Sequence, residues 1–345
     1  MTRVDPSPAT LRWAAETAGS DVPARLVRQL AGGTHAVTHL VETARPARQM
    51  VLRRYPPGDT AAAREAAILT ALDGMDGWAP ELIGADATGR RTGAPSVLIT
   101  RLPGRADLSV PPAQAAEQLG RALTRVHAVP LDRFRRLRDG LAAVSPPATA
   151  PPTTAPPTTA PPTTAPPTTA PPTTAPPSAA PPTTAQPGAA PPATARPSTA
   201  PAAGVLTADG DRLSAGESVL THFDYWSGNV LWDGRTITGI VDWSGASRAP
   251  RGFDVSWCRL DLVLLHGEPA ADIFLAAYEQ AARTTVPDVA LWDLFALTNA
   301  HHTVETWHPN YAGLGRDDLT PAELRSRHTA WTRTRLSRYQ QGQAR

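Results

Sequence analysis

The stretch at residues 220–243 reads LTHFDYWSGNVLWDGRTITGIVDW, and the rest of the chain is interpreted around it. Two runs rich in Val, Ile, Leu and Trp flank Asp233-Gly234, which predicts a β-hairpin because a tight primed turn needs positive φ. Asn229 then begins one strand and Asp242 ends the next, so the hairpin brings their side chains together. Asp224 lies five residues before Asn229, on the loop leading into the first strand.

An Asp, an Asn and a second Asp are the residue types that phosphoryl transfer uses. One carboxylate orients or deprotonates the attacking hydroxyl, while the amide oxygen and the other carboxylate hold magnesium against nucleotide phosphates. His222, Asp224 and Asn229 follow the His-x-Asp-x-x-x-x-Asn spacing of the protein-kinase catalytic loop, and Asp242 stands where the kinase metal-binding Asp stands. The alternative is a surface hairpin with incidental acids, but agreement at four positions favours phosphoryl transfer.

Length and composition limit the class of protein. The 345 residues suffice for one large domain or two smaller ones, and a net charge of +2 without a basic, aromatic-interleaved block argues against nucleic-acid binding. No run approaches the roughly 20 apolar residues that span a membrane, and the first residues lack a signal-peptide core. Cys258 is the only cysteine, so no intramolecular disulfide can form. We therefore expect a cytoplasmic protein that binds neither nucleic acid nor membrane.

The N-terminal part predicts an antiparallel sheet after a lead-in at residues 1–20. Apolar residues alternate around Gly32-Gly33 and again around Arg45-Pro46, which indicates three strands. The first turn, with Gly32, Gly33 and Thr34, allows backbone amides to approach a phosphate, although a Gly-Gly turn more often only closes a hairpin. These three residues are candidate nucleotide contacts.

A cation on the third strand, MVLRR, is the candidate for gripping the α- and β-phosphates. Arg53 is the candidate for this role, and Arg54 is expected to face the opposite side of the strand. The following stretch DTAAAREAAILTALDG predicts a helix whose Glu65 would pair with Arg53. Solvent-facing arginines and a solvated glutamate are the alternatives. The chain has no Lys, and Arg is a planar fork where Lys is a point charge, so the replacement is not chemically neutral.

A hinge is expected after the predicted strand SVLIT at residues 96–100, where the chain breaks at Pro-Gly. Backbone groups there would read an adenine edge, so Arg101 and Leu102 are candidate nucleotide contacts. The next predicted helix ends at His127, for which a capping or core role is favoured over catalysis.

The composition changes at residues 145–204, where APPTT repeats in tandem and then decays. Proline at this density precludes helices and sheet ladders, so we expect disorder with polyproline II character. Lengthening a loop from about ten to about sixty residues costs only roughly 1.6 kcal/mol, so the tract is tolerated inside a domain. PxxP segments in it offer weak protein contacts, but passive expansion of a surface loop is favoured.

The region after the hairpin is predicted to be mainly helical. Asp254 stands at the start of an apolar helix over residues 255–265, where capping and the helix dipole favour an acid. Further along the chain, His301, His302 and Glu305 suggest a zinc site, but neighbouring histidines on a helix point about 100° apart, so a shared metal ion is disfavoured. These three residues and Trp307 could instead line a substrate pocket.

These motifs resemble the aminoglycoside phosphotransferase family, which shares the protein-kinase-like fold with choline kinases and homoserine kinase-like enzymes. The resemblance covers roughly residues 25–143 and 205–310. Its most specific parts are HFDYWSGNVLW, GIVDW and RGFDVSWCRLDL, supported by VLRR, REAAILTAL and ITRLPG.

The resemblance implies an α+β, bilobal protein-kinase-like fold. A small antiparallel sheet with one helix would form the nucleotide-binding lobe, and a larger, mainly helical lobe would carry the catalytic and substrate residues. The expected boundaries are residues 21–100 for the first lobe, 101–104 for the hinge, and 105–144 with 205–345 for the second lobe.

The resemblance also implies residue roles. Asp224 corresponds to the catalytic base, His222 to the histidine that braces its loop, and Asp254 to an acid that orders the loop. The remaining correspondences are Asn229 and Asp242 as magnesium ligands, Arg53 as the phosphate-binding cation and Glu65 as its partner. Phe223 and Tyr225 beside the base, Arg in place of the usual Lys, and the long insertion depart from the family pattern.

The expected function is therefore ATP- or GTP-dependent transfer of a phosphoryl group to a small-molecule hydroxyl, with Mg2+. The alternative is a catalytically silent, kinase-like nucleotide-binding or scaffold protein whose Pro-rich arm contacts partners. Aminoglycosides are polycations that call for an acid-rich cleft, whereas acids and arginines nearly balance from Arg251 onward. Aminoglycosides thus stand beside macrolides, sugars, amino alcohols and amino acids as acceptors.

Overall fold

The computed structural model describes residues 5–30, 36–144 and 200–343. Gly32, Gly33 and Thr34 lie outside the described residues, as does most of the Pro-rich tract, so the expectations placed there stay predictions. The described residues belong to a single unit formed by residues 1–144 and 198–345.

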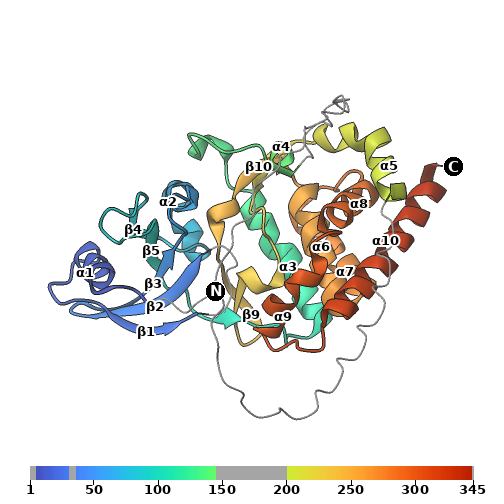
Figure 1. Cartoon of the computed structure of the whole chain (residues 1–345). Helices are drawn as coiled ribbons and strands as arrows, with labels where there is room; N and C mark the ends of the chain where they lie inside the picture. The colour runs from blue at the N-terminus through green and yellow to red at the C-terminus, as the bar shows by residue number, and fades with distance from the viewer. Residues whose placement is uncertain (1–4, 31–35, 145–199, 344–345) are drawn as a thin grey trace, which may run out of the picture. The chain divides into compact units, whose positions relative to one another are not determined.

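A five-stranded antiparallel sheet forms the N-terminal part, in the order β1-β2-β3-β5-β4 (Figure 1). Its strands are β1 (Arg25–Gln29), β2 (Val37–Ala44), β3 (Ala47–Arg54), β4 (Leu82–Asp86) and β5 (Ser96–Thr100). The three predicted strands and the SVLIT strand are confirmed. β4 was not anticipated, because its sequence LIGAD is short and contains glycine. A Cβ at Gly84 would lie 2.3 Å from Thr17 Cγ2, so this glycine lets the N-terminal helix approach the strand.

Each face of this sheet is covered by one helix. Side chains alternate along a strand, so Met50 and Leu52 of β3 pack with Trp13 of α1 (Pro8–Thr17). The opposite face packs against α2 (Ala61–Leu72), through Val97 and Ile99 of β5. Arg53 therefore projects toward α2, which explains why a charged residue is buried there.

The second part is mainly helical, as the predicted fold requires. Its helices are α3 (Pro112–His127), α4 (Gly140–Val144), α5 (Ala200–Asp209), α6 (Gly252–His266), α7 (Glu268–Ala282), α8 (Val289–Ala300), α9 (His308–Ala312) and α10 (Pro321–Gln343). Its strands are β6 (Arg105–Ala106), β7 (Ser218–Thr221), β8 (Val230–Asp233), β9 (Thr236–Ile240) and β10 (Ser247–Pro250). They form a β6-β8-β9 sheet and a β10-β7 pair.

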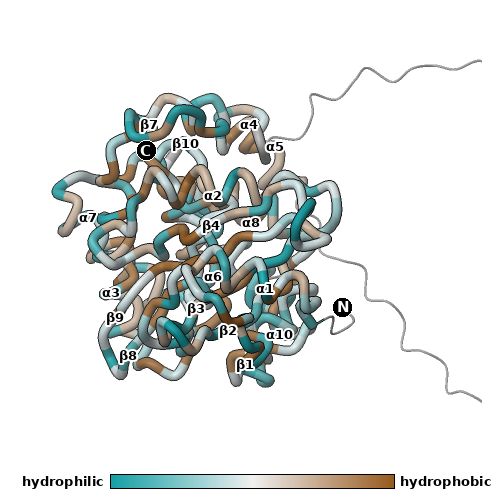
Figure 2. Tube along the Cα trace, turned by 90° about the vertical axis from the view of Figure 1, so that its left-hand side faces the viewer, coloured by the Kyte–Doolittle hydropathy of each residue, from teal (hydrophilic) through white to brown (hydrophobic). Residues whose placement is uncertain are grey.

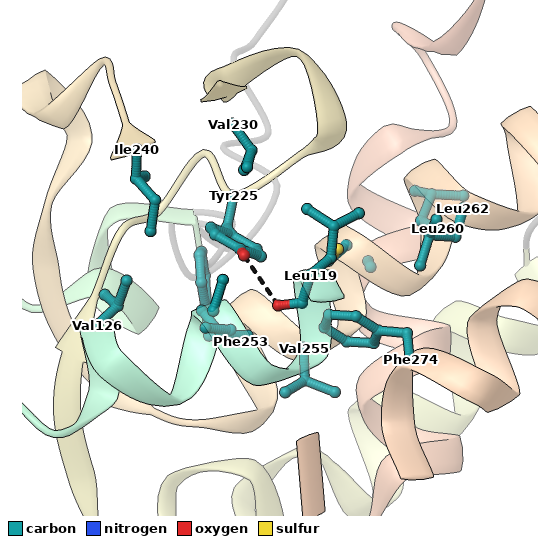
Figure 3. Close-up of a cluster of buried hydrophobic side chains, with 14 of the residues drawn as sticks. Leu119, Val126, Tyr225, Val230, Ile240, Phe253, Val255, Leu260, Leu262 and Phe274 are labelled. Carbon is teal, nitrogen blue, oxygen red and sulfur yellow. Dashed lines mark hydrogen bonds between the residues drawn. The ribbon is translucent and has the colours of Figure 1, made fainter. Parts of the chain in front are cut away.

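The core of this part is built around α6. Most residues of α6 are buried, and Figure 2 shows hydrophobic stretches of the trace, in brown, around it. Leu119 of α3, Phe274 of α7 and Tyr225 of the loop before β8 pack into the same cluster (Figure 3). The Tyr225 hydroxyl donates to the Leu119 carbonyl oxygen at 2.9 Å, so the buried phenol is satisfied. The loop that carries Asp224 is thereby anchored in the core.

Two expected boundaries differ from the structure. The Pro-rich tract was expected to extend to residue 204, but α5 begins at Ala200, where proline becomes sparse. The hairpin is present, yet Asp233 pairs with Thr236, so the turn is Gly234-Arg235 rather than Asp233-Gly234. Gly234, at φ +58°, occupies the first central position, where a type II′ turn requires glycine.

No helix in the described part of the chain is long and apolar enough to cross a membrane.

Candidate active site

Arg53 and Glu65 form a buried ion pair between β3 and α2. Arg53 Nη1 donates to Glu65 Oε1 at 2.7 Å, and the two residues are only 4% and 1% exposed. The Tyr55 hydroxyl donates to the other carboxylate oxygen, Oε2. Burial raises the pKa of Glu65 even though Arg53 opposes that shift. The predicted pair is present, and the alternative of solvent-facing residues is wrong.

Arg53 also reaches the end of the hairpin. Its Nη2 donates to Asp242 Oδ1 at 2.6 Å, which joins the N-terminal sheet to the loop after β9. The Ser244 hydroxyl donates to the same oxygen at 3.0 Å. Asp242 has φ +68°, a left-handed conformation that is uncommon for a residue other than glycine. Such strain is concentrated at functional sites.

Asp224 and Asn229 meet beside the contact of Arg53 with Asp242, at the open end of the hairpin. Asn229 Nδ2 donates to the Asp224 carbonyl at 2.9 Å and to Asp224 Oδ2 at 3.0 Å. The Val241 amide donates to the Asn229 carbonyl at 2.9 Å, so the strand ends are also joined directly. The sequence spacing therefore correctly predicts that these polar groups converge.

Asp254 braces the loop that precedes Asp224. Its carboxylate accepts from the amides of His222 at 2.6 Å and Phe223 at 2.9 Å. It also lies 3.3 Å from Nε2 of His127, whose Nδ1 lies 2.7 Å from the Tyr278 hydroxyl. Asp254 lies in the first turn of α6, as expected, but Arg251 occupies the N-cap and the Asp254 carboxylate orders the loop instead of capping the helix. His127 has the expected core role.

His222 links the two loops of the site. Its ring is fully buried, and Nε2 lies 3.0 Å from the Val241 carbonyl oxygen. Because a carbonyl only accepts, Nε2 carries the proton. Burial lowers the pKa of His222, which favours the neutral ring. This geometry suits bracing better than proton transfer.

Asp261 is a supporting residue that the sequence analysis missed. Its Oδ2 accepts from the Ser227 amide at 2.9 Å and hydroxyl at 2.5 Å, while Oδ1 accepts from the Tyr311 hydroxyl at 2.9 Å. It lies seven residues after Asp254, which places both acids on one face of α6. An acid pair at this spacing in an apolar helix is the signal that could have revealed it.

The surroundings drive the pKa values of the two central acids apart. Desolvation of its carboxylate and the negative charge of Asp242 raise the pKa of Asp224 to about 7, although the residue as a whole is exposed, so that solvent screens both effects. Burial would also raise the pKa of Asp242, but Arg53 outweighs it and holds that pKa below its usual value. One acid can thus exchange a proton near neutral pH while the other stays ionised, a pattern typical of acid–base sites.

Asn229 and Asp242 also offer the oxygen ligands that magnesium prefers. Within the described ranges, no hydrogen bond uses Asn229 Oδ1 or Asp242 Oδ2. No group of three or more His, Cys, Asp or Glu suited to a metal occurs in the described part of the chain. The residues therefore fit an ion that takes few protein ligands and completes its shell with phosphate and water, as Mg2+ does.

Other candidates lie apart from these contacts. Arg101 is exposed and donates to Gln49, whereas Leu102 packs against Gly239 of β9. Glu305 forms an ion pair with Arg325 at 2.7 Å, which argues against the zinc alternative.

Comparison with known proteins identifies a family. The model of the phosphotransferase enzyme family, APH, matches residues 26–292, which is most of the chain. None of the curated proteins compared matches the chain significantly in sequence.

Solved structures share the fold at low sequence identity. Macrolide 2′-phosphotransferase MphH from Brachybacterium faecium is 16% identical, with a TM-score of 0.52 over 92% of this chain and 97% of that one. A thermostable variant of aminoglycoside phosphotransferase APH(4)-Ia, in a ternary complex with ADP and hygromycin B, is 15% identical, with a TM-score of 0.52 over 92% and 98%. Another variant, in complex with AMP-PNP and hygromycin B, is 16% identical, with a TM-score of 0.52 over 93% and 99%.

Proposed function

The chain belongs to the phosphotransferase enzyme family, and we propose that it transfers the γ-phosphate of ATP or GTP to a hydroxyl group of a small molecule in the cytoplasm. The observation that carries this proposal is the convergence of Asp224, Asn229 and Asp242 next to the buried Arg53. These groups come from the sheet, the catalytic loop and the hairpin end. Phosphoryl transfer depends mainly on such positioning and on charge stabilisation.

In the proposed reaction, Asp224 orients the acceptor hydroxyl and takes its proton. The acceptor oxygen bonds to the γ-phosphorus while the bond to the β-bridging oxygen breaks, and the nucleoside diphosphate leaves. A pKa of about 7 keeps Asp224 partly ionised at neutral pH and makes it a better proton acceptor than an ordinary carboxylate. Arg53, fixed by Glu65, is the proposed cation for the α- and β-phosphates.

Asn229 Oδ1 and Asp242 Oδ2 would hold Mg2+ in this site. The ion would neutralise negative charge on the β- and γ-phosphates. Nucleotide binding is further supported by the similar solved structures, which contain ADP or AMP-PNP.

The acceptor is proposed by chemical class. The matched structures include a macrolide 2′-phosphotransferase and an enzyme bound to hygromycin B. In this chain, several acids of the helical part are paired with arginines: Glu305 with Arg325, Asp318 with Arg316, and Glu323 with Arg327. Paired acids attract a polycation weakly, so an acceptor of low positive charge is favoured over a highly charged aminoglycoside.

The test is a thermal-shift screen followed by turnover measurements. ATP, GTP and a panel of hydroxyl compounds would be added with and without Mg2+, because a bound ligand raises apparent stability by mass action. Compounds that stabilise the protein would then be assayed for nucleoside diphosphate release and phosphorylated product. We expect both to require Mg2+ and to disappear with excess EDTA.

Magnesium-dependent nucleotide binding without turnover on any acceptor would contradict the proposal and indicate a catalytically silent nucleotide-binding protein. Growth of a sensitive host expressing the chain, on macrolides and aminoglycosides separately, distinguishes the antibiotic acceptors.

A further inference from the structure

Phe223, the residue before Asp224, has a strained backbone. Its φ is +75°, in the left-handed region that a bulky side chain rarely adopts. Such a conformation persists only where the surrounding contacts enforce it. The position of Asp224 therefore depends on what holds Phe223.

Contacts from two segments, α6 and the segment around Arg138, hold Phe223. Its amide donates to Asp254 Oδ1 at 2.9 Å. Its ring stacks on Phe253 of α6, with centroids 4.9 Å apart and planes inclined by 19°. The guanidinium carbon of Arg138 lies 3.9 Å from the centroid of the same ring, a close cation–π contact.

Arg138 also contacts the loop that carries Asp242. Its Nη2 donates to the Gly245 carbonyl at 2.6 Å, three residues after Asp242. Its own carbonyl accepts from the Arg248 amide at 3.0 Å, and Asp139 forms a β-bridge with Arg248. One side chain thus touches both loops of the site, although it lies 85 or more residues before either in the sequence.

Close packing fixes the segment that supplies Arg138. A Cβ at Gly140 would meet Ser247 Oγ at 2.7 Å, so this glycine permits the segment to lie directly against β10. The exposed Arg135 and Arg136 precede Arg138 in the same segment, and the Arg138 contacts to Phe223 and Gly245 are not shared by them. They are therefore matched controls.

We propose that Arg138 is a positioning residue that clamps the Phe223–Asp224 loop to the loop after Asp242. Its planar guanidinium stacks on Phe223 and donates to Gly245 at the same time, which fixes the separation of the two acids. Lysine cannot reproduce both contacts, because its ammonium is compact and lacks the planar fork. The proposal rests on the proposed phosphotransferase function for its effect on turnover, but its structural effect can be measured without turnover.

The test compares R138Q and R138K with R135Q in the full chain. Amide hydrogen exchange is measured on peptides covering residues 220–226 and 243–248, with Mg2+ and ATP present and absent. We expect faster exchange in both peptides for the two Arg138 variants and unchanged exchange for R135Q. R138K keeps the charge and serves if R138Q does not fold.

Turnover provides the second measurement. We expect R138Q to lower kcat by roughly tenfold to a hundredfold, because a displacement of about 1 Å can have an effect of this size. KM for the nucleotide should stay within about twofold, since Arg53 is untouched, and methylguanidinium should partly restore kcat in R138A but not alter R135A.

Unchanged exchange in both peptides would overturn the clamp. Faster exchange with wild-type kcat would also overturn it, because the loops would then move without consequence for the reaction. If the wild-type protein has no turnover on any acceptor, the proposed function fails, and hydrogen exchange alone decides whether Arg138 joins the two loops.

Discussion

Arg53 and Arg259 are both buried arginines that bind acids, but they do so in different settings. Arg259 Nε and Nη2 donate to the two oxygens of Asp293 at 2.9 and 3.1 Å, and Nη1 donates to the Ala271 carbonyl at 2.7 Å. Arg335 Nε lies 2.9 Å from the same carboxylate. Both Asp293 oxygens are therefore engaged, in a network carried entirely by helices.

Arg53 instead binds Asp242 through one carboxylate oxygen only. Among the described residues no hydrogen bond uses the other oxygen, and the Asp242 backbone is left-handed. A buried ion pair thus occurs both in a structural network and in the candidate active site, so burial alone does not distinguish them. The distinguishing features are an acid with remaining ligand capacity and a strained backbone that presents it.

The sharpest test of this comparison removes one acid charge from each network. We expect D242N to lower turnover at least about a hundredfold, because the proposed metal ligand, which also binds Arg53, loses its charge. D293N should instead destabilise the protein by ~3–5 kcal/mol, since Arg259 and Arg335 would stay buried without a counter-charge. Urea unfolding and kcat per folded molecule check the two effects; a normal kcat in D242N would remove the distinction.

A smaller effect is expected from replacing the fork of Arg53. In R53K the ammonium cannot donate to Glu65 and Asp242 in the present geometry, so KM for the nucleotide should rise about tenfold. R54K is the control, because Arg54 points to the other face of β3. Equal KM values for the two variants, in steady-state assays, would show that Arg53 does not hold the nucleotide.

The pH dependence of turnover should report Asp224. With its pKa at about 7, turnover should fall about tenfold for each pH unit well below 7, as Asp224 becomes protonated. In the unfolded chain the same group has a pKa of ~3.9. The folded state therefore binds the proton more tightly, so the stability contributed by Asp224 is lost as pH rises from about 4 to 7.

Thermal unfolding of the wild type and of D224N, measured as a function of pH, checks this prediction. Relative to D224N, the stability of the wild type should decline between about pH 4 and pH 7. A difference between the two proteins that does not change with pH would contradict the raised pKa.

The smallest effect is expected at Ser244, whose hydroxyl donates to Asp242 Oδ1 at 3.0 Å. S244A should raise the pKa of Asp242 slightly and lower turnover by about twofold to fivefold, the range of one ordinary hydrogen bond. The exposed Ser109 supplies the control variant, S109A. A loss as large as that of D242N would indicate that Ser244 has a more direct role.

Regular spacing explains what could be predicted from the sequence. Asp224, Asn229 and Asp242 converge because a hairpin necessarily joins its ends, and Arg53 faces Glu65 because side chains alternate on a strand. β4 escaped prediction because it is short and contains glycine, and β7 because it is short and pairs with β10, which lies further along the chain. The contacts of Asp261 with Tyr311 and of Arg138 with Gly245 escaped for the same reason, since each depends on tertiary packing.

The left-handed conformations of Phe223 and Asp242 also could not be read from the sequence. Phe rarely adopts this region, and Asp adopts it more often but still in a minority of cases, so only the completed contacts enforce it here. The residues proposed to supply the chemistry could therefore be selected from their spacing in the sequence, whereas those that hold them in place could not.

The most direct test of the central claim is phosphoryl transfer by D224N under single-turnover conditions, with Mg2+, nucleotide and an identified acceptor. Asp233→Asn, at the exposed end of β8, serves as the control. The account predicts that D224N loses about 10²- to 10⁴-fold in rate, while Asp233→Asn reacts at the wild-type rate. The thermal stability of D224N at pH 8 should equal or exceed that of the wild type, which shows that the lost rate does not come from unfolding. Transfer by D224N at the wild-type rate would contradict the assignment of Asp224 as the group that orients the acceptor.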